Sequence, residues 1–540
     1  MPASRTPLFD QAIAEHHARQ RPGTRTCLET GESFEFTQAD LDLYRSLKVC
    51  VSRLSPLARF RRIAARVSGF ELYKRTIDGK ELISMFDEAS PAKVIPTNEF
   101  YGDVFDGRTY AQIYDLTKSF AEQWKAFSWS VPRPAIIQDT TSQNCPWALY
   151  DFGFKNCYFT YAGLEMSDSS YADLCVTCTH VVDVTSCIRS EWCYECVACV
   201  ECARSAYSER CFASQNLRFC ADCRNCEDCF GCINLRNKKF CFLNEQLDEE
   251  AYKKRVAEID LRDPQVVAAW QGRIRKEIRG TATRRACVTY ASERSSGDDL
   301  VNCRDVDGID IVDGERVRSS CGLSVAKDCI DLLYGVEAER CTAGMFCVNC
   351  YEATACTGIQ DCVQVEYSEF LYACEYCFGC IGLQHKKFCI FNTQYTEDEY
   401  WSFLDRIKAQ LVQEGIYGES PAYDASLFAY NGSFALAVDP LTEEMAKKLG
   451  SRWVRFPETN GARAFRTVTP EVELIQELGV ALPTEHPTVR RLRRMQDLQP
   501  LTLVDRSCVM CQAPLRSRYR ASTVKEVLCE VCYEQQVIQS

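Results

Sequence analysis

The chain has 540 residues, of which 46% are hydrophobic and 26% are charged, and it carries 35 cysteines and a formal net charge of −12. The apolar content is enough to bury sizeable cores and excludes a disordered chain, while 26 glycines and 18 prolines are too few for a collagen-like or low-complexity chain. The acidic balance argues against a nucleic-acid binder that works through its whole surface.

The start of the sequence shows no signal-peptide pattern, and no apolar run approaches about eighteen residues, so we expect a cytoplasmic protein without a membrane partner. In that reducing compartment cysteines are more often metal ligands or buried thiols than disulfides. The cysteines are therefore the main guide to the fold and to candidate sites.

The first predicted unit, 27–103, is basic. Between Arg53 and Arg75 seven basic residues stand against one acidic residue, Glu71, which leaves a local charge of +6. A run of charge is usually a solvated face, but it can also be a patch that binds phosphates. A helical linker is expected at 104–138.

Two cysteine-rich blocks, 139–244 and 287–392, are predicted to be tandem copies. A gap-free shift of 148 residues superimposes seven cysteines, and the best stretch reads CFGCINLRNKKFCFLN (229–244) against CFGCIGLQHKKFCIFN (377–392). The matched residues are Cys193, Cys199, Cys202, Cys226, Cys229, Cys232 and Cys241 with Cys341, Cys347, Cys350, Cys374, Cys377, Cys380 and Cys389.

Helical patterns follow both blocks. The first indicates a helical connector at 245–286, and the second indicates a helix at 393–415. The second pattern carries a capping box, formed by Thr396 and Glu399, and has Gly415 just past its end. Both features are typical of the places where helices begin and end.

A period of three residues runs through both blocks. All sixteen cysteines from Cys145 to Cys241, and all ten from Cys329 to Cys389, fall on one phase, and the other residues on that phase are nearly all small or apolar. We therefore expect the phase to face inward. Several cysteines also recur every 18 residues, which predicts a β-solenoid with six triplets in each coil. A bundle of polyproline-II helices has the same period and is the alternative, whereas this phase would wander around an α-helix.

The spacing of stacked coils bears on what the cysteines do. Equivalent residues would lie about 4.8 Å apart, which is wider than the roughly 3.8 Å between sulfurs of a tetrahedral zinc site. We therefore favour cysteine as a small buried apolar residue that fills a narrow core. Metal binding by part of the array and redox or disulfide chemistry are the other interpretations.

A mixed linker at 416–464 leads to a last unit at 465–540, which holds the clearest metal motif. Cys508 and Cys511 form one CxxC pair, and Cys529 and Cys532 form another after seventeen intervening residues. Such spacing predicts a closed tetrahedral zinc site, since each pair aims two thiolates at one point. Four protein ligands leave no open position for catalysis, so this zinc would be structural, and its loss would unfold the unit.

The two terminal units are predicted to be related. A shift of 431 residues aligns leucines, prolines and arginines of the first unit with identical residues of the last, and the basic patch recurs between Arg490 and Arg520 as eight basic against two acidic residues. Continuing this alignment, with a further shift of two, places four other residues at the cysteine positions: Ile77, Lys80, Pro96 and Glu99. These residues cannot hold zinc, so the first unit is expected to be a degenerate, metal-free ribbon.

Several motifs together resemble a known family. They are CFGCxxLxxKKFCxxN in both blocks, the tyrosine that follows each, and the segments SPAYDASLFAYN (420–431) and PLTEEMAKKLGSRW (440–453). From about Phe34 to Tyr533 the chain looks like the cysteine-rich, zinc-ribbon-containing proteins common in small-genome bacteria of the candidate phyla radiation. The resemblance implies terminal treble-clef or ribbon units around a cysteine-rich repeat core, and it adds no reaction. Family members typically keep cysteines in the N-terminal ribbon, where this sequence departs from them.

The sequence thus predicts a mainly β fold with helical connectors, in which two duplicated cysteine-rich β-solenoid blocks are flanked by zinc-ribbon or treble-clef-like terminal units. It contains no dinucleotide loop, P-loop, HExxH or GxSxG motif, so we expect no catalytic residues and no enzyme activity. The leading hypothesis is a non-enzymatic zinc-binding scaffold or interaction protein. Its solenoid surface would bind a protein partner, and its exposed ends could also allow self-association.

Two alternative functions follow from other features of the sequence. The first is association with RNA or the ribosome through the basic terminal units. The arginines that would contact phosphates are Arg59, Arg61, Arg62, Arg490, Arg491, Arg493 and Arg494. The second is a multi-metal or redox thiol protein, which would carry many metal equivalents per chain, whereas the zinc scaffold would carry one.

Overall fold

The computed structural model shows a mixed α/β protein. Helices make up 32% and strands 23% of the described residues, and the strands form many small sheets of two to five members. The prediction of a mainly β fold built on two β-solenoid blocks is therefore wrong. The prediction failed because helices, rather than further strands, bury much of the apolar surface of the chain.

The structure describes residues 4–540 with gaps, and the residues left out are 70, 139–140, 146, 165–172, 176–177, 180–184, 188–189, 192–196, 200–213, 313–314, 316–317, 322–328, 331–339, 343, 345–353, 357–362, 460–461, 468, 499–502, 523 and 539–540. Within the described part, no helix combines the length and the apolar character needed to cross a membrane. Seven cysteines of the predicted inward phase lie outside the described residues: Cys193, Cys196, Cys202, Cys211, Cys347, Cys350 and Cys362.

The chain forms two compact units, each assembled from segments far apart in the sequence. Unit 1 comprises Met1–Ala135, Cys287–Val454 and Leu501–Leu503. Unit 2 comprises Ile136–Ala286, Arg455–Pro500 and Val504–Ser540. Unit 1 therefore joins the N-terminal segment to the second cysteine-rich block, and unit 2 joins the first block to the C-terminal segment. The finer domain boundaries predicted from the sequence stay predictions.

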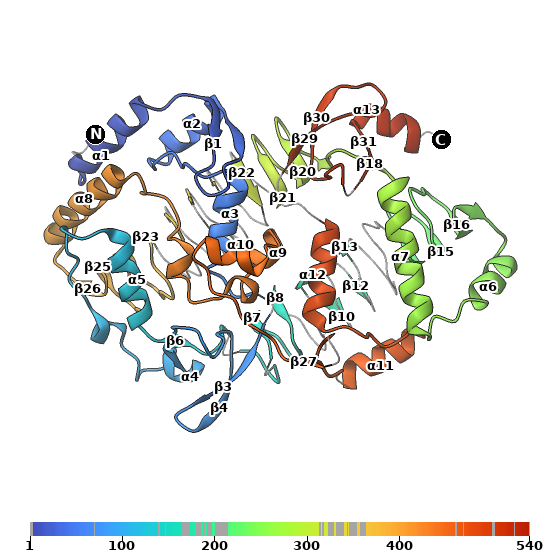
Figure 1. Ribbon diagram of the computed structural model, residues 1–540, viewed down its shortest axis with the longest axis horizontal. Coiled ribbons are helices and arrows are strands. Elements are labelled where there is room, and N and C mark those ends of the chain that lie inside the picture. The colour runs from blue at the N-terminus through green and yellow to red at the C-terminus, as the bar shows by residue number, and fades with distance from the viewer. Residues whose placement is uncertain are drawn as a thin grey trace. The chain divides into compact units, whose positions relative to one another are not determined.

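Unit 1 contains helices, hairpins and two four-stranded sheets. Its helices are α1 (Pro7–Ala18), α2 (Gln38–Ser46), α3 (Pro56–Ala64), α4 (Thr97–Phe100), α5 (Phe120–Ser130), α8 (Glu397–Glu414), α9 (Ala435–Val438) and α10 (Glu443–Lys448), with short 3₁₀ turns η1 (Gly107–Tyr110), η2 (Tyr423–Ala425) and η3 (Tyr430–Gly432). Its strands are β1 (Gly23–Thr26), β2 (Ser33–Phe36), β3 (Tyr73–Ile77), β4 (Lys80–Ser84), β5 (Val94–Ile95), β6 (Arg133–Pro134), β19 (Thr289–Tyr290), β20 (Ser296–Val301), β21 (Asp307–Val312), β22 (Arg318–Cys321), β23 (Val363–Glu366), β24 (Glu375–Phe378), β25 (Lys387–Ile390) and β26 (Thr393–Gln394). Helix α1 packs beside α8, although the two are nearly four hundred residues apart in the chain (Figure 1).

Unit 2 contains a five-stranded sheet, a four-stranded sheet and several two-stranded pairs. Its strands are β7 (Leu149–Phe152), β8 (Tyr161–Leu164), β9 (Asp173–Cys175), β10 (Cys178–Thr179), β11 (Thr185–Cys187), β12 (Ser190–Glu191), β13 (Val197–Cys199), β14 (Gln215–Arg218), β15 (Glu227–Phe230), β16 (Lys239–Phe242), β17 (Glu245–Gln246), β18 (Thr283–Arg285), β27 (Glu458–Thr459), β28 (Ala462–Arg463), β29 (Val504–Ser507), β30 (Pro514–Ser517) and β31 (Glu526–Leu528). Its helices are α6 (Glu249–Ala257), α7 (Pro264–Gly280), α11 (Thr469–Leu478), α12 (Pro487–Leu498) and α13 (Glu530–Tyr533), followed by a π-helical turn η4 (Glu534–Ile538).

Strands β14 to β16 of the first block and β23 to β25 of the second pair in parallel with an offset of 12 residues, whereas β19 to β21, at the start of the second block, pair in parallel with an offset of 11. Gln215 of β14 pairs with Glu227 of β15, which pairs with Lys239 of β16. In the second block Glu375 of β24 pairs with Lys387 of β25. Four triplets, not six, therefore separate paired positions, and the predicted 18-residue coil is wrong. The cysteine recurrence misled because it marks only some of the inward positions.

The period of three has its cause in the backbone. Every third residue from Asn216 to Leu243, and from Gln364 to Phe391, has a positive φ in the left-handed region. Several of these residues are Asn or Asp, which tolerate this conformation better than most. The left-handed residues turn the chain, so that a cysteine directly after one faces the interior, as Cys220 does after Phe219.

The predicted inward direction of the cysteine phase is confirmed for the described residues. The phase cysteines whose burial the structure describes are at most 4% exposed. They are Cys145, Cys157, Cys220, Cys223, Cys226, Cys229, Cys232, Cys241, Cys329, Cys341, Cys356, Cys374, Cys377, Cys380 and Cys389. Their burial next to Leu217 and Leu383 agrees with cysteine acting as a small core residue.

One glycine is required by packing as well as by its backbone angle. Gly379 has a φ of 62°, and a Cβ there would lie 2.3 Å from Cε1 of Phe391. That ring cannot easily move, because it is stacked on Phe127 of α5 with a centroid distance of 4.9 Å. Gly379→Ala is therefore expected to cost about 2–4 kcal/mol of unit 1 stability.

The control for Gly379→Ala is Gly415→Ala. Gly415 also has a left-handed φ, of 74°, but no atom lies within 4 Å of its added Cβ. This variant should lose only the backbone contribution, about 1–2 kcal/mol. Hydrogen exchange of α8, measured side by side in both variants, would separate the two contributions. Equal losses would show that contact with Phe391 does not matter.

The two ends of the chain contain the same order of elements. We call Gln38–Phe100 the N-terminal module and Thr469–Tyr533 the C-terminal module. Each runs through two helices, an antiparallel hairpin, a short strand and a short helix. Adding 431 to the first residues of α2 and α3, 38 and 56, gives 469 and 487, where α11 and α12 begin. The relation between the chain ends that the sequence predicts is therefore confirmed.

The helices that follow the cysteine-rich blocks are only partly as predicted. The helix at 393–415 is confirmed as α8, with the capping box of Thr396 and Glu399 and with Gly415 in the left-handed conformation past its end. The pattern at 245–286 is two helices, because Asp263 and Pro264 start a new helix with an N-cap and a proline at N1.

Aromatic side chains pack helices against sheets in both units. In unit 2, Trp270 of α7 packs against Phe230 and Phe242, whose rings stack with centroids 5.3 Å apart. In unit 1, Phe127 of α5 packs on Phe391 beside β25. These contacts place the core of each unit between a cysteine-rich block and a long helix.

Candidate metal centre

The first half of the metal centre is the turn of the hairpin β29–β30. The strands pair from Val504 with Ser517 to Ser507 with Pro514, which leaves Cys508 to Ala513 to form the turn. The backbone N–H of Gln512 donates to the carbonyl oxygen of Cys508 at 2.9 Å, and Gln512 adopts a φ of 59°. This tight turn brings the two thiols of the first CxxC pair to the same side.

The second half of the centre is the start of α13. Cys529 is the N-cap residue, and Cys532 lies in the first turn of that helix. The backbone N–H of Tyr533 donates to the carbonyl oxygen of Cys529 at 2.9 Å. Strand β31 leads directly into this turn, so its position in the sheet fixes where the second pair of thiols lies.

The four thiols converge on one point. The Sγ atoms of Cys508, Cys511, Cys529 and Cys532 all lie within 4.8 Å of one another. The Sγ atoms of Cys511 and Cys529 are 3.8 Å apart, close to the roughly 3.8 Å that a tetrahedral zinc–thiolate site requires. The donor set therefore fits zinc, and no other group of three or more metal-ligating side chains converges in the described part of the chain.

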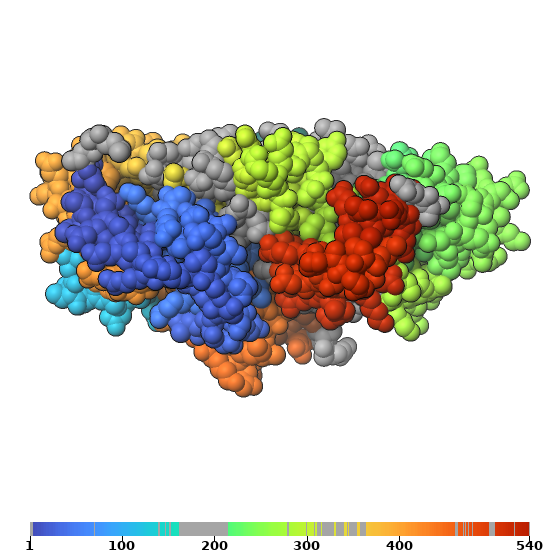
Figure 2. Space-filling view, turned by 90° about the horizontal axis from the view of Figure 1, so that it is seen from above, coloured from blue at the N-terminus to red at the C-terminus, as the bar shows by residue number. Residues whose placement is uncertain are grey.

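Burial differs between the four ligands. Cys508 and Cys532 are buried against Leu528 and Tyr533, whereas Cys511 is exposed. Figure 2 shows the C-terminal segment, in red, on the face turned to the viewer. The centre thus has a dry side that packs on the module and a side open to solvent, through which a metal could enter.

Hydrogen bonds shift the pKa values of two of the four thiols in opposite directions. Burial raises the pKa of Cys508, but backbone hydrogen bonds from Cys511, Cys529 and Met510 outweigh it and lower the pKa to about 6. The side-chain hydrogen bond to Cys529 raises the pKa of Cys532 to about 12. Cys508 is therefore a thiolate at neutral pH, and a metal ion would displace the proton from Cys532.

The metal centre is attached to the first cysteine-rich block through Tyr533. Its hydroxyl group donates to the carboxylate of Asp222 and accepts a hydrogen bond from Arg236 Nη2 at 2.5 Å. Burial raises the pKa of Tyr533, so the phenol keeps its proton. Arg236 Nη2 also lies 3.1 Å from Asp222 Oδ2, which closes a buried triad next to the ligand Cys532.

The centre is also attached to the segment that leaves α7. Strand β31 pairs in parallel with β18, and the N–H of Ala286 donates to the carbonyl oxygen of Leu528 at 2.8 Å. Arg285 forms an ion pair with Glu530, which lies between the two ligands of the second pair. Residues 283–286 are the last part of unit 2 before the chain enters unit 1 at Cys287.

The N-terminal module has no equivalent centre. Ile77 and Lys80 face each other as the last pair of the hairpin β3–β4, across a two-residue turn of Asp78 and Gly79. Pro96 precedes α4 as its N-cap residue, and Glu99 lies inside that helix. These four residues occupy places that correspond to the cysteines, but only one of them offers a ligand atom.

The arginines of the N-terminal module are engaged within unit 1. Arg61 is 3% exposed and pairs with Glu29 at 3.1 Å and with Asp439 at 2.7 Å. Arg62 pairs with the same glutamate at 2.6 Å, and Arg59 donates from Nη1 to the carbonyl oxygen of Leu54 at 3.2 Å. Their guanidinium groups therefore make contacts within unit 1 rather than form a solvent-facing patch.

Three of the four predicted arginines of the C-terminal module, Arg490, Arg491 and Arg494, are buried. Arg490 forms a buried ion pair with Glu471 at 3.0 Å, and Arg493 pairs with Glu485. Arg491 and Arg494 are 4% and 3% exposed. The spacing 487, 490, 491, 494 is that of the inner face of an amphipathic helix, and this signal could have revealed their burial. The RNA alternative gains no support from these positions.

Two features of the site were not found from the sequence. One is the triad of Tyr533, Asp222 and Arg236, which depends on contacts between residues 311 positions apart. The other is the pairing of β31 with β18. Comparison of the chain with protein-family models, with curated proteins and with solved structures gave no match. The family resemblance suggested by the motifs therefore stays a prediction, and the four-cysteine cluster itself carries the functional argument.

Proposed function

We propose that the protein is a zinc-stabilised, non-enzymatic interaction protein in which one structural zinc ion holds the C-terminal module together. The observation that carries this proposal is the convergence of four thiol sulfurs within 4.8 Å. A zinc ion bound by four protein thiolates has no free coordination position for a substrate or water, so it would supply folding energy rather than catalysis.

The structure suggests what that folding energy would maintain. The second ligand pair lies between β31, which pairs with β18, and Tyr533, which contacts Asp222. Zinc would therefore clasp the segment 283–286 and the first cysteine-rich block at the same time. This clasp fixes the end of unit 2 at the point where the chain passes into unit 1.

Elemental analysis of the anaerobically purified full chain tests the proposal. We expect one zinc per chain, and we expect Cys511→Ser to lower the zinc content by at least about tenfold, since one thiolate of four is lost. Cys287→Ser is the matched control, because that cysteine belongs to no cluster of metal-ligating side chains among the residues that the structure describes, and its loss should leave the stoichiometry unchanged. Several metal equivalents per chain would contradict the proposal and favour a metal-loaded thiol array.

A further inference from the structure

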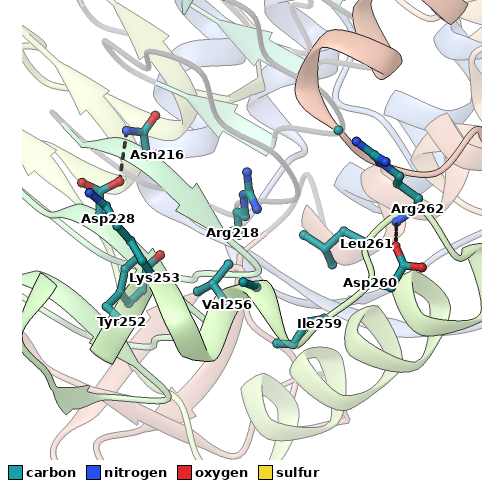
Figure 3. Close-up of a pocket in the computed structure, with 12 residues that line it drawn as sticks. Asn216, Arg218, Asp228, Tyr252, Lys253, Val256, Ile259, Asp260, Leu261 and Arg262 are labelled. Atoms are coloured by element: carbon teal, nitrogen blue, oxygen red, sulfur yellow. Dashed lines mark hydrogen bonds between the residues drawn. The ribbon is translucent and has the colours of Figure 1, made fainter. Parts of the chain in front are cut away.

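Unit 2 contains a pocket that the zinc proposal does not use. It has a volume of about 500 Å³ and lies between β14, α6 and the loop that follows α6. Tyr252, Val256 and Ile259 form an apolar side, and Arg218 and Arg262 lie on the other side, as Figure 3 shows. This volume is within the range of about 300–1,000 Å³ that is typical of small-molecule sites.

The carboxylates of the pocket are already engaged, but two of its cations are not. Asp228 accepts a hydrogen bond from Nδ2 of Asn216 at 3.1 Å, and Asp260 accepts one from the backbone N–H of Arg262 at 3.1 Å. In contrast, the guanidinium groups of Arg218 and Arg262 make no hydrogen bond or ion pair with any residue in the described part of the chain. The pocket therefore holds two guanidinium groups that have no ion-pair partner among the described residues, beside two carboxylates whose hydrogen bonds come from neutral donors.

The corresponding place in the second cysteine-rich block holds an ion pair. The shift of 148 residues aligns Arg218 with Glu366 and Tyr252 with Tyr400. Glu366 forms an ion pair with Lys408 at 2.8 Å, and both side chains are largely buried. The glutamate in unit 1 thus has its partner within the fold, whereas the arginine at the same position in unit 2 has none. Among the described residues, this difference in charge and pairing distinguishes the first copy from the second.

The helices that follow the two blocks differ at this place. Helix α8 runs without a break from Glu397 to Glu414, so it carries Lys408 across to Glu366. Helix α6 ends at Ala257, and the chain then turns away through Asp260 before α7 begins. The early end of α6 leaves the space that the side chains above line.

We propose that this pocket binds a small organic anion, a carboxylate or a phosphate monoester, whose charged group pairs with Arg218 and Arg262 and whose apolar part packs on Tyr252, Val256 and Ile259. Guanidinium groups match the geometry of both kinds of oxyanion and bind them through two parallel hydrogen bonds. Burial raises the pKa of Tyr252, so its phenol stays neutral and adds an uncharged hydrogen-bond donor.

Calorimetric titration of the zinc-loaded full chain tests this proposal with matched probes. The anionic probes are 3-phenylpropionate and phenyl phosphate, and the neutral probe is 3-phenyl-1-propanol, which has the apolar body without the charge. We expect both or one of the anions to bind at least about tenfold more tightly than the alcohol. The stronger of the two anions identifies the type of oxyanion that the pocket prefers.

Variants locate the binding. Arg218→Gln should weaken anion binding about tenfold and leave the neutral probe unaffected, and Arg262→Gln is a second variant on an exposed loop that does not disturb the sheet. Lys254→Gln is the control, since Lys254 lies on α6 but does not line the pocket. The proposal is overturned if neither anion binds below about 10 mM, or if binding persists unchanged in both arginine variants. Zinc content, measured in parallel, keeps this outcome separate from a failure of the zinc proposal.

Discussion

Removal of zinc is expected to unfold the C-terminal module and to expose residues 283–286 to solvent exchange. Structural zinc contributes an apparent 10–16 kcal/mol, to order of magnitude, in small zinc-binding peptides at neutral pH, far more than the hairpin β29–β30 could supply alone. Since β31 leads into the second ligand pair and pairs with β18, loss of the metal should release both strands. Cys532→Ser should have the same effect as chelation, because it removes a buried ligand.

Hydrogen–deuterium exchange measures this effect directly. Peptides that cover β18 and β31 should lose their protection by at least about a hundredfold when zinc is removed, while α8 of unit 1 should keep its protection. Tyr533→Phe separates metal binding from the clasp, because it removes the hydroxyl that contacts Asp222 and leaves the four thiols in place. It should keep one zinc yet raise exchange near Asp222. Unchanged protection of β18 in verified metal-free protein would refute the clasp.

Glu369→Ala is expected to destabilise unit 1 by about 3–5 kcal/mol, the usual loss when one member of a buried ion pair is removed. Glu369 pairs with Arg133 at 2.8 Å and with Arg66 at 2.6 Å, and the side chain of Arg133 is fully buried. Without the carboxylate, two guanidinium groups would stay buried without their counter-charge. The exposed pair of Lys74 and Glu81 provides the control, since Glu81→Ala should cost less than about 1 kcal/mol.

The same carboxylate gives unit 1 an acid-sensitive contribution to stability. Burial raises the pKa of Glu369, but Arg133 and Arg66 outweigh it and hold the pKa below its ordinary value of 4.5. A folded-state pKa below the unfolded one gives stabilisation that is complete above the unfolded value and is lost as the pH falls through the folded value. Exchange of α5 against pH should therefore steepen below about pH 4.5 in the natural protein and less so in Glu369→Ala. Parallel curves would show that other groups control the acid response.

Local spacing predicted the features that depend on residues near one another in the sequence. The metal centre follows from two CxxC pairs, and the ends of α8 follow from Thr396 and Gly415. The inward phase of the cysteines was also predictable, because the cysteines that directly follow a left-handed residue in these blocks are buried whatever the partner strand. In each case a short stretch of chain contains the whole physical cause.

Features that depend on distant partners were missed. The offset of 12 residues is a property of strand pairing, and cysteines fill only part of the inward positions, so their recurrence at 18 gave the wrong coil. The inner roles of Arg61 and Arg490 depend on Glu29 and Glu471, which compete with solvent for the same charge. A basic run viewed without its acidic partners looks like a charged surface, whereas here several of its arginines, such as Arg61 and Arg490, are buried in ion pairs.

Each unit combines an earlier and a later segment of the chain, and this arrangement has a consequence for folding during synthesis. The N-terminal module leaves the ribosome first but belongs with the second cysteine-rich block, and the first block that follows it belongs with the last module. Related modules and related blocks therefore meet in the wrong combination before the right partners exist, which is a recognised route to kinetic traps. The contacts differ, since Glu369 of the second block is held by Arg66 of the N-terminal module and Asp222 of the first block by Tyr533 of the C-terminal module. This difference would let each block discriminate against the wrong module, and unit 2 cannot be completed until the C-terminal module has been made.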